Sequence, residues 1–364
     1  MTTEIQAPPT TTAPVFVALS GGVDSAVAAC LLKEEHTNVI GISHRHWPES
    51  RCCSTACIDR CAEQCEDMGI PYSAVDCIVE FAQQIVDNFV ASYERGVTPN
   101  PCVLCNEQIR FDLMVDKYYR QKGEEPAADF KLATGHYARV VRHDGRYRLR
   151  RGIDPDKDQS YMLHRLSQRE LSRCIFPLGN MHKAEVRAMA EKLGLKSAKE
   201  SDSQDICFVQ GRYQEFIRQY SETVQKPGPI LDREGNQLGE HEGIAFYTRG
   251  QRSGLGLNGG PWYVVETNLQ TNQVVVGRRE DLLERAFTIS DIHWGAAPRQ
   301  EPFECVVQTR YRSQARSCIV EPAAGDAATV RLSEASADVT PGQSAVFYEE
   351  DWVVGGGIIQ DFIR

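Results

Sequence analysis

An apolar run, a glycine-rich turn and a helical pattern follow one another near the start of the chain, and together they constrain its fold. The run Val15–Leu19 leads into Ser20–Ser25, of sequence Ser-Gly-Gly-Val-Asp-Ser, and a helical pattern then covers Ala26–Lys33. A second apolar run, Val39–Ser43, comes next. Strand, tight turn, helix and strand within about thirty residues predict a βαβ unit, and therefore a parallel sheet with right-handed crossovers.

The same alternation continues and then gives way to short strands. Helical patterns cover Ser54–Met68, Asn106–Tyr119, Met181–Leu193 and the apolar stripe from Ile78 to Tyr93, and strand-like runs lie at Tyr72–Val75 and Phe130–Thr134. Arg139–Arg150 predicts a hairpin turning at Asp144-Gly145. From about Lys226, turn signals separate short alternating strands, as in a small closed or half-closed barrel.

We therefore expect an α/β fold in which an N-terminal doubly wound parallel sheet is followed by a small β-rich domain and a C-terminal β-barrel. The predicted boundaries are a tail over residues 1–13, a catalytic domain over 14–218, a central domain over 219–282 and the barrel over 283–364. A length of 364 residues suits two or three domains better than one.

Charge and cysteine content limit the classes of function. The chain has no apolar run long enough to cross a membrane and no signal-peptide pattern, so we expect a cytoplasmic protein without a membrane partner. The net charge of -10 means that nucleic-acid binding would need locally clustered basic residues. An odd number of cysteines, 13, in such a chain favours reactive or metal-binding thiols over a disulfide framework.

The turn Ser20–Ser25 has the setting of an anion site, because it leaves a strand and enters a helix N-terminus. The lysine of the common phosphate loop is absent, and a plain glycine turn with Asp24 or Ser25 as helix cap is the alternative. The turn resembles the SGGxDS loop of the PP-loop ATP pyrophosphatases, whose domain is adenine nucleotide alpha hydrolase-like. That resemblance implies that ATP adenylates a substrate and releases pyrophosphate, with Mg²⁺ accompanying the phosphates.

Three cysteines stand out by their context. Cys102 and Cys105 lie in Thr98–Asn106, which reads as a proline-rich loop just before a helix, and Cys207 lies in Asp202–Phe208. A helix N-terminus favours the thiolate, which is both a nucleophile and a metal ligand. One Cys-x-x-Cys pair by itself leaves a structural, zinc-binding or catalytic role open.

A set of motifs spread in order over nearly the whole chain closely resembles the tRNA-specific 2-thiouridylases. The motifs are Ser20–Ser25, Asn100-Pro101 with Cys105-Asn106, Thr134–Tyr137, Lys157–Tyr161, Ile206–Phe208 and Pro341–Gln343. The resemblance implies adenylation of the C2 carbonyl oxygen of a wobble uridine in tRNA, then sulfur transfer from a cysteine persulfide. A separate sulfur-donor protein, a cysteine desulfurase or sulfur relay, is implied as a partner.

The resemblance also assigns residues. Cys207 is expected to carry the persulfide and Cys105 to be its partner. The expected ATP contacts are Ala18, Leu19, Ser20, Gly21, Gly22, Val23, Asp24, Ser25, His44 and Gly135. The expected tRNA contacts, around a flipped base, are Asn100, Pro101, Cys102, His136, Lys157, Asp158, Gln159, Arg310, Tyr311 and Gln343.

Cys102 departs from the pattern of many family members, which have an aspartate with acid and base work at that place. A thiol can transfer protons, so Cys102 is a third catalytic candidate. Cys102, Cys105 and Cys207 could instead hold three irons of a [4Fe-4S] cluster whose fourth iron binds sulfide. The sulfur donor is therefore either a persulfide or cluster-bound sulfide.

The remaining cysteines are read as structural. Cys52, Cys53, Cys57, Cys61 and Cys65 recur at helical spacing from Cys53 on, which predicts a buried helix face rather than a metal site. Core positions are expected for Cys30, Cys77, Cys174, Cys305 and Cys318.

A basic patch is predicted on the hairpin, from Arg139, Arg142, Arg146, Arg148, Arg150 and Arg151, where an RNA-binding face and a solvated strand face are the two interpretations. Two other functions stay open: another PP-loop adenylating synthetase, or a cysteine-rich metal or redox protein on a nucleotide-binding fold. A PP-loop synthetase of another kind needs no paired reactive cysteines. A metal or redox protein would not release pyrophosphate from ATP.

Overall fold

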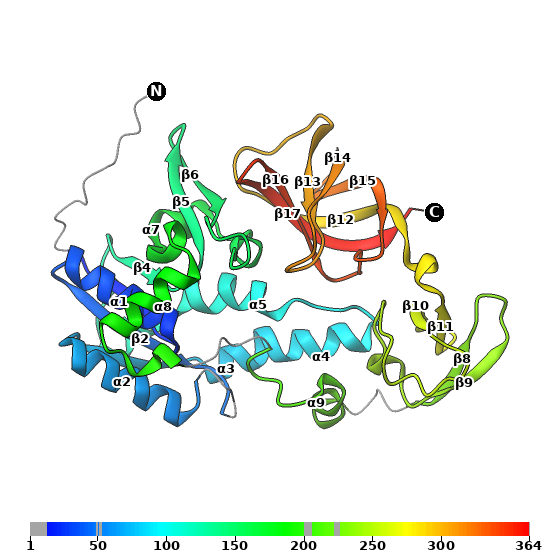
Figure 1. Ribbon diagram of the computed structural model, residues 1–364, viewed down its shortest axis with the longest axis horizontal. Helices are drawn as coiled ribbons and strands as arrows, with labels where there is room; N and C mark the ends of the chain where they lie inside the picture. Colours follow the sequence, from blue (N-terminus) through cyan, green and yellow to red (C-terminus); the bar gives the residue numbers. More distant parts are fainter. Residues whose placement is uncertain (1–12, 49, 51–52, 200–205, 222–225, 364) are drawn as a thin grey trace. The chain divides into compact units, whose positions relative to one another are not determined.

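The computed structural model describes residues 13–48, 50, 53–199, 206–221 and 226–363 (Figure 1). The chain forms two compact units, and each is built from separate stretches of sequence. The first unit comprises Met1–Phe81, Asn106–Ser160 and Leu166–Phe208. The second comprises Ala82–Cys105, Tyr161–Arg165 and Val209–Arg364. The predicted tail and Cys52 lie outside the described residues, apart from residue 13.

A parallel sheet forms the centre of the first unit, as predicted. Its strand order is β3 (Tyr72–Asp76), β2 (Val39–Arg45), β1 (Val15–Ala18), β4 (Lys131–Thr134) and β7 (Cys174–Ile175), all parallel. The helices of this unit include α1 (Val23–Glu35), α2 (Thr55–Met68), α3 (Ile78–Phe81), α6 (Met114–Lys122), α7 (Gln168–Arg173) and α8 (Lys183–Lys192). Short turns of helix lie at η4 (Pro177–Asn180) and η5 (Lys196–Lys199).

Alternate side chains of β1 pack on opposite faces of the sheet. Val15 and Val17 join a buried cluster with side chains of α1 and α2. Phe16 packs edge-on against Tyr118 and Tyr119 of α6, with ring centroids 4.9 and 5.8 Å apart. Because helices cover both faces, the sheet is doubly wound, and the prediction of this fold class is confirmed.

The helix predicted over the stripe from Ile78 to Tyr93 is present but changes its winding. It consists of α3, the π-helical segment η1 (Ala82–Val86) and α4 (Asp87–Glu94). Phe89 and Tyr93 of α4 pack against Phe216 and Tyr213 of α9 (Tyr213–Tyr220), with centroids 5.9 and 4.7 Å apart. This packing holds α4 in the second unit.

The prediction that Cys102 and Cys105 lie on a loop before a helix is wrong. Both lie within a helical segment made of α5 (Pro101–Leu104), the π-helical η2 (Cys105–Leu113) and α6. Asn100 is the N-cap of α5, since its side chain accepts a hydrogen bond from the backbone N–H of Val103 at 3.4 Å. Pro101 suits the first helical position because its missing N–H would have no intrahelical partner there.

The predicted hairpin is confirmed, with β5 (Ala138–His143) paired to β6 (Arg146–Arg151). Asp144 and Gly145 have φ values of 49° and 77°, as a type I′ turn requires. A four-stranded sheet forms in the central region, in the order β10 (Tyr263–Asn268), β11 (Gln273–Gly277), β8 (Gly228–Leu231) and β9 (Gln237–His241). The helical turns η6 (Ile244–Phe246) and η7 (Arg279–Leu282) flank it in sequence.

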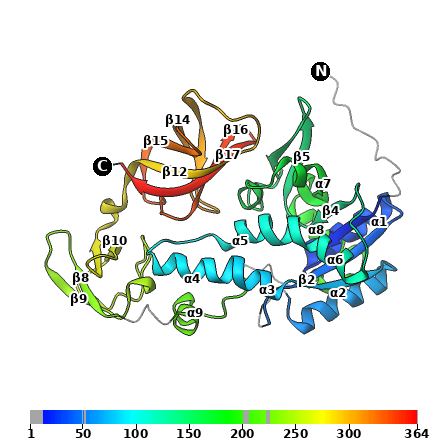
Figure 2. The same cartoon turned by 180° about the vertical axis from the view of Figure 1, so that it is seen from behind.

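The C-terminal strands close into the predicted barrel (Figure 2). Their order is β12 (Glu284–Trp294), β15 (Ala327–Ser336), β14 (Arg316–Ala323), β13 (Phe303–Gln308), β16 (Ser344–Glu349) and β17 (Trp352–Phe362), and β12 also pairs with β17. Val307, Val320, Phe287 and Phe347 are among the side chains that fill its core. Two further segments precede it in the chain, η3 (Ser160–Leu163) and α9.

Candidate functional site

The turn Ser20–Ser25 is a tight bend that its own side chains and those of α2 stabilise. Gly21 has a φ of 73°, which favours glycine, and Gly22 is the N-cap of α1. Ser25 Oγ accepts from the backbone N–H of Ser20 at 3.2 Å and donates to the Gly22 carbonyl at 3.1 Å. The thiol of Cys57 donates to the Ser20 carbonyl at 3.0 Å. The loop is thus preformed at a helix N-terminus, where an anion is favoured.

Asp24 is held by two groups from distant parts of the first unit. Lys183 Nζ lies 2.7 Å from each carboxylate oxygen, and the hydroxyl of Tyr137 donates to Oδ1 at 2.8 Å. Lys183 is 8% exposed, so the cation of this pair is buried. The Asp24 carboxylate and the Lys183 ammonium group are therefore both fixed beside the turn.

Gly135 lies against the same turn. A Cβ atom built on it would come within 2.9 Å of the backbone of both Asp24 and Ser25. Only glycine fits there without moving the start of α1. The structure therefore brings together two parts of the predicted ATP site, the turn and Gly135, which sequence separates widely.

His44 lies near the carboxyl end of β2, the edge of a parallel sheet where ligands bind. The residue is 8% exposed, and its Nε2 has no hydrogen-bond partner among the described residues. Burial, with His46 and Arg110 nearby, lowers the pKa of His44 well below its usual value. The imidazole is therefore neutral at pH 7, and a buried nitrogen of this kind is suited to a polar ligand atom.

Cys207 contacts a histidine that the sequence analysis did not select. His46 Nε2 lies 3.4 Å from Cys207 Sγ and 3.2 Å from Ser50 Oγ. His46 Nδ1 lies 3.3 Å from the backbone carbonyl of His44, which can only accept, and this assigns the proton to Nδ1. Nε2 is then an acceptor that faces the thiol.

Aromatic packing fixes the segment that carries Cys207. Phe208 is buried, with its ring 5.5 Å from that of Phe81 and 6.5 Å from that of Trp47. The His46 ring packs on Phe81 at 4.5 Å. The thiol and its histidine are therefore held by one aromatic cluster.

Cys102 and Cys105 belong to the second unit, whereas Cys207 belongs to the first. Cys105 is 9% exposed and Cys102 is half-buried. Across the described ranges, no three His, Cys, Asp or Glu side chains form a group that could hold a metal ion. No step of the mechanism below runs through a [4Fe-4S] cluster.

Several predicted tRNA contacts have internal hydrogen bonds. Asp158 accepts from Arg151 at 2.8 Å and from the Gly152 and Ser160 backbone N–H groups at 3.0 Å. The Gln159 side chain accepts from the Tyr137 N–H at 3.0 Å. These two residues therefore support the fold, while Lys157 is half-buried in the same segment.

His136 follows β4 and is partly buried. Its Nδ1 lies 2.7 Å from Thr134 Oγ1. Burial, followed by the charge of Arg110, lowers the pKa of His136 to about 3. The ring is thus a neutral hydrogen-bonding group at pH 7.

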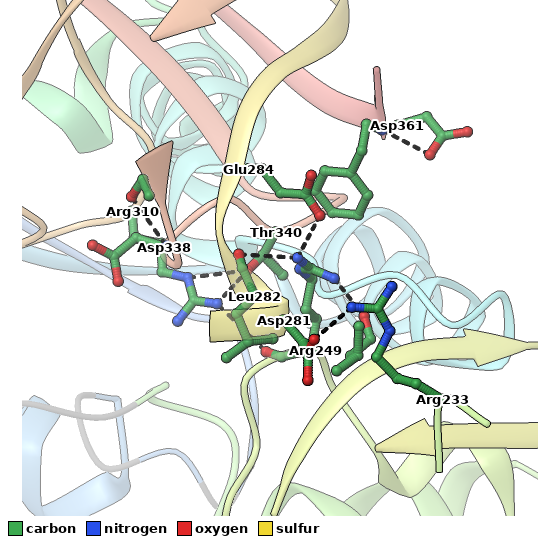
Figure 3. Close-up of polar contacts among 12 residues, drawn as sticks. Arg233, Arg249, Asp281, Leu282, Glu284, Arg310, Asp338, Thr340 and Asp361 are labelled. Carbon is green, nitrogen blue, oxygen red and sulfur yellow. Dashed lines mark hydrogen bonds and ion pairs between the residues drawn. The ribbon is translucent and has the colours of Figure 1, made fainter. Parts of the chain in front are cut away.

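Arg310 is held by protein groups rather than directed freely outward (Figure 3). Its Nε donates to Thr340 Oγ1 at 3.1 Å, and one terminal nitrogen lies 3.5 Å from the carbonyl of Arg249. Burial lowers its pKa. Arg249, also drawn in Figure 3, is 8% exposed and pairs with Glu284 at 2.7 Å. Tyr311, next to Arg310, lies with its ring 6.1 Å from that of Tyr161.

The arginines of the hairpin differ in their surroundings. Arg142 and Arg146 are exposed near the turn. Arg139 donates to the Arg151 carbonyl at 2.7 Å, and Arg151 pairs with Asp158. In the predicted basic patch, the arginines at the tip are therefore exposed, and the other four, Arg139, Arg148, Arg150 and Arg151, are half-buried.

The cysteines of α2 form the buried face that was predicted. Cys57, Cys61 and Cys65 pack in the core cluster beneath the sheet. Cys53 precedes the helix; its burial opposes ionisation, but hydrogen bonds from His46 and Ser50 lower its pKa. The core prediction is confirmed for the buried Cys77 and Cys318. Cys30, Cys174 and Cys305 are half-buried, and Cys30 and Cys305 pack against the edges of core clusters.

Comparison with known proteins decides the family. Residues 13–211 match the family described as a tRNA methyl transferase HUP domain, 214–278 a tRNA methyl transferase PRC-barrel domain and 284–359 an aminomethyltransferase beta-barrel domain. A tRNA-specific 2-thiouridylase MnmA of Geobacter metallireducens is 45% identical, covering 95% of this chain and 96% of that protein. The chain belongs to the tRNA-specific 2-thiouridylase family. A relative of the same name from Proteus mirabilis is 39% identical, over 96% of this chain and 98% of the relative.

One solved structure is more distantly similar to this member of the 2-thiouridylase family. The U34-tRNA thiolase NcsA of Methanococcus maripaludis with its [4Fe-4S] cluster is 24% identical, with a TM-score of 0.36, over 58% of this chain and 65% of that chain. In the described part of the chain, no helix is long and apolar enough to span a bilayer.

Two residues of this 2-thiouridylase family member were missed from the sequence. His46 could have been suspected because it directly follows β2, at the edge of the sheet where sites form. Lys183 gave no signal, since its approach to Asp24 spans 159 positions of sequence.

Proposed function

We propose that this chain is an ATP-dependent enzyme that replaces the C2 oxygen of a tRNA wobble uridine with sulfur. The preformed Ser20–Ser25 loop with Gly135 packed against it is the observation that carries the ATP part of the proposal. Family membership at 45% identity over nearly the whole chain supports the tRNA and sulfur parts. Three domains are proposed, with boundaries at 14–218, 219–282 and 283–364.

In the first step, the uridine C2 oxygen attacks the α-phosphorus of ATP and expels pyrophosphate. The loop Ser20–Ser25 binds the pyrophosphate, and His44 and Gly135 border the nucleotide. Mg²⁺ would come with ATP, held by its phosphates. Adenylation makes the C2 oxygen part of a good leaving group, AMP.

In the second step, a persulfide on Cys207 attacks C2 with its outer sulfur. The C2–O bond breaks, AMP leaves, and a C2–S–S–Cys207 linkage remains. The thiolate of Cys105 then attacks the Cys207 sulfur, which breaks the linkage and releases 2-thiouridine. A Cys105–Cys207 disulfide is left, and an external thiol must reduce it before the next turnover.

His46 supports Cys207 in this scheme. Its Nε2, 3.4 Å from Sγ, accepts the thiol proton before the Cys207 sulfur receives sulfur from the donor protein. Cys102 replaces the aspartate of many relatives and is proposed to move a proton near the base. His136 and the exposed Arg142 and Arg146 are proposed to contact the RNA, and a cytoplasmic location would keep these thiols reduced.

Iron analysis separates the persulfide route from a cluster-bound sulfide. The protein is purified anaerobically beside a variant in which Cys102, Cys105 and Cys207 are alanine, and iron, acid-labile sulfide and tRNA thiolation are measured. Iron-free protein that still thiolates tRNA supports the persulfide route. About four irons per chain, lost in the variant together with activity, would replace it by a cluster-bound donor. Wild-type protein that thiolates no tRNA, with or without iron, would refute the function itself.

A further inference from the structure

A turn of the barrel contacts the start of the helix that carries two of the working thiols. The turn is Pro341-Gly342-Gln343, between β15 and β16, and the helix is α5 with Cys102, followed directly by Cys105. All of these residues belong to the second unit. Figure 1 shows α5 and the strands that flank the turn.

The side-chain amide of Gln343 donates to two backbone carbonyls just before α5. Its Nε2 lies 2.9 Å from the carbonyl oxygen of Thr98 and 3.1 Å from that of Pro99. An amide nitrogen has two hydrogens, so these two contacts fill its donor capacity. The donor group of Gln343 therefore acts on the protein backbone, whereas the family resemblance predicted a tRNA contact.

Three further hydrogen bonds run beside it. The backbone N–H of Thr98 donates to the Pro341 carbonyl at 3.1 Å. The Tyr161 hydroxyl donates to the Ser344 carbonyl at 2.9 Å and hydrogen-bonds the side chain of Asn100, the cap of α5. Tyr161 is 1% exposed, so water cannot replace these contacts.

Gly342 permits the close approach. Its φ is 89°, a left-handed value, and a Cβ built on it would lie 2.2 Å from Val97 Cγ1 and 2.8 Å from the Thr98 carbonyl oxygen. Backbone and side-chain contacts therefore join residues 97–100 to residues 341–344 over a short, tightly packed stretch.

We propose that Gln343 is a positioning residue for the thiols of Cys102 and Cys105. By fixing the carbonyls of Thr98 and Pro99, it fixes where α5 begins and hence where both thiols point. This role rests on the proposed function in one respect: it takes Cys102 and Cys105 as the thiols that act in tRNA thiolation.

Two variants of Gln343 test it. Gln343→Met keeps the length of the side chain but removes both donors without adding charge. Gln343→Glu also removes them and sets a carboxylate against two carbonyl oxygens. The matched control is Gln360→Glu, since the exposed Gln360 amide donates to a carbonyl of its own strand, Ile358, at 3.1 Å.

The first readout needs neither ATP nor tRNA. Alkylation of Cys102 and Cys105 by iodoacetamide is followed by peptide mass spectrometry, together with hydrogen exchange of peptide 97–105. Both Gln343 variants should change the alkylation rates about fivefold or more and speed exchange at Thr98, and Gln360→Glu should match the wild type. Unchanged rates and exchange in both variants would overturn the proposal, whether or not the wild type thiolates tRNA.

The second readout separates positioning from RNA contact. With unmodified tRNA at saturation, kcat for thiolation should fall at least tenfold in Gln343→Met while KM for tRNA stays within about twofold. A tenfold weaker tRNA affinity with unchanged kcat would instead make Gln343 an RNA contact. If the Gln343 variants do not fold, Tyr161→Phe removes a neighbouring hydrogen bond of the same stretch, and it should alter the same alkylation rates; unaltered rates would count against the proposal.

Discussion

Lys183 and Asp24 form a bidentate ion pair beside the nucleotide turn, with Nζ 2.7 Å from both carboxylate oxygens. The two residues come from the N-termini of different helices, α8 and α1. A fixed cation therefore lies next to a loop whose own sequence contains none.

Asp24→Ala should abolish tRNA-dependent pyrophosphate release, and Lys183→Met should reduce it about 100-fold, the scale of losing one charged group from a preorganised site. Lys192→Met, on the exposed last turn of α8, is the control and should retain full activity. Pyrophosphate release at saturating ATP and tRNA is the measurement. Normal release by Lys183→Met would show that the ion pair is structural only.

Cys207→Ser should abolish thiolation and leave adenylation intact, because the serine hydroxyl cannot carry a persulfide. AMP and pyrophosphate formation and 2-thiouridine content are measured on the same samples. In the wild type, a single turnover without reductant should leave a Cys105–Cys207 disulfide, detectable by peptide mass spectrometry. Thiolation by Cys207→Ser would remove this residue from the mechanism.

His46→Asn should slow thiolation about 100-fold at pH 7, a typical loss for a missing general base. The rate should recover at higher pH, because the Cys207 thiol then loses its proton to solvent. Pyrophosphate release should be unchanged. The control is His143→Asn, since the His143 side chain is 48% exposed on the hairpin. A pH profile that does not differ between His46→Asn and the wild type would contradict the assignment.

Burial of His164, which is 2% exposed, makes stability depend on pH. Burial lowers its pKa to about 3, whereas an unfolded histidine has a pKa of about 6.5. Between these values the unfolded state binds the extra proton, so stability is complete above about pH 6.5 and is lost as the pH falls toward 3. This histidine alone should remove about 2 kcal/mol between pH 7 and pH 5.

Urea denaturation at the two pH values checks this expectation. His164→Asn should lose less stability on acidification than the wild type, by about 2 kcal/mol, whatever its stability at pH 7. His143→Asn should follow the wild type. Equal losses in His164→Asn and the wild type would mean that the imidazole is protonated in the folded state.

Local patterns were sufficient to predict the fold class and several of its elements. The β1, turn and α1 unit, the type I′ turn at Asp144-Gly145 and the buried thiols of α2 follow from spacing and turn chemistry within a few residues. The misplacement of Cys102 was avoidable, because an asparagine cap followed by proline at the first helical position was present in the sequence.

The contacts that build the site could not be predicted in this way. His46 meets Cys207 across 161 positions, and Gln343 meets Thr98 across 245. Such pairs depend on how separate elements pack, and the hydrophobic periodicity of each element does not predict that packing. Family resemblance pointed to Asp158 and Gln343 as tRNA contacts, but their hydrogen bonds to the backbone emerge only from the fold.

The interleaving of the two units affects how the chain folds as it is made. The segment Ala82–Cys105 belongs with Val209–Arg364, yet it leaves the ribosome long before that region. Until α9 emerges, Phe89 and Tyr93 have neither Phe216 nor Tyr213 to pack against. A nascent chain, or one ended by a premature stop codon before residue 213, therefore displays an aromatic helix face of the kind that chaperones bind.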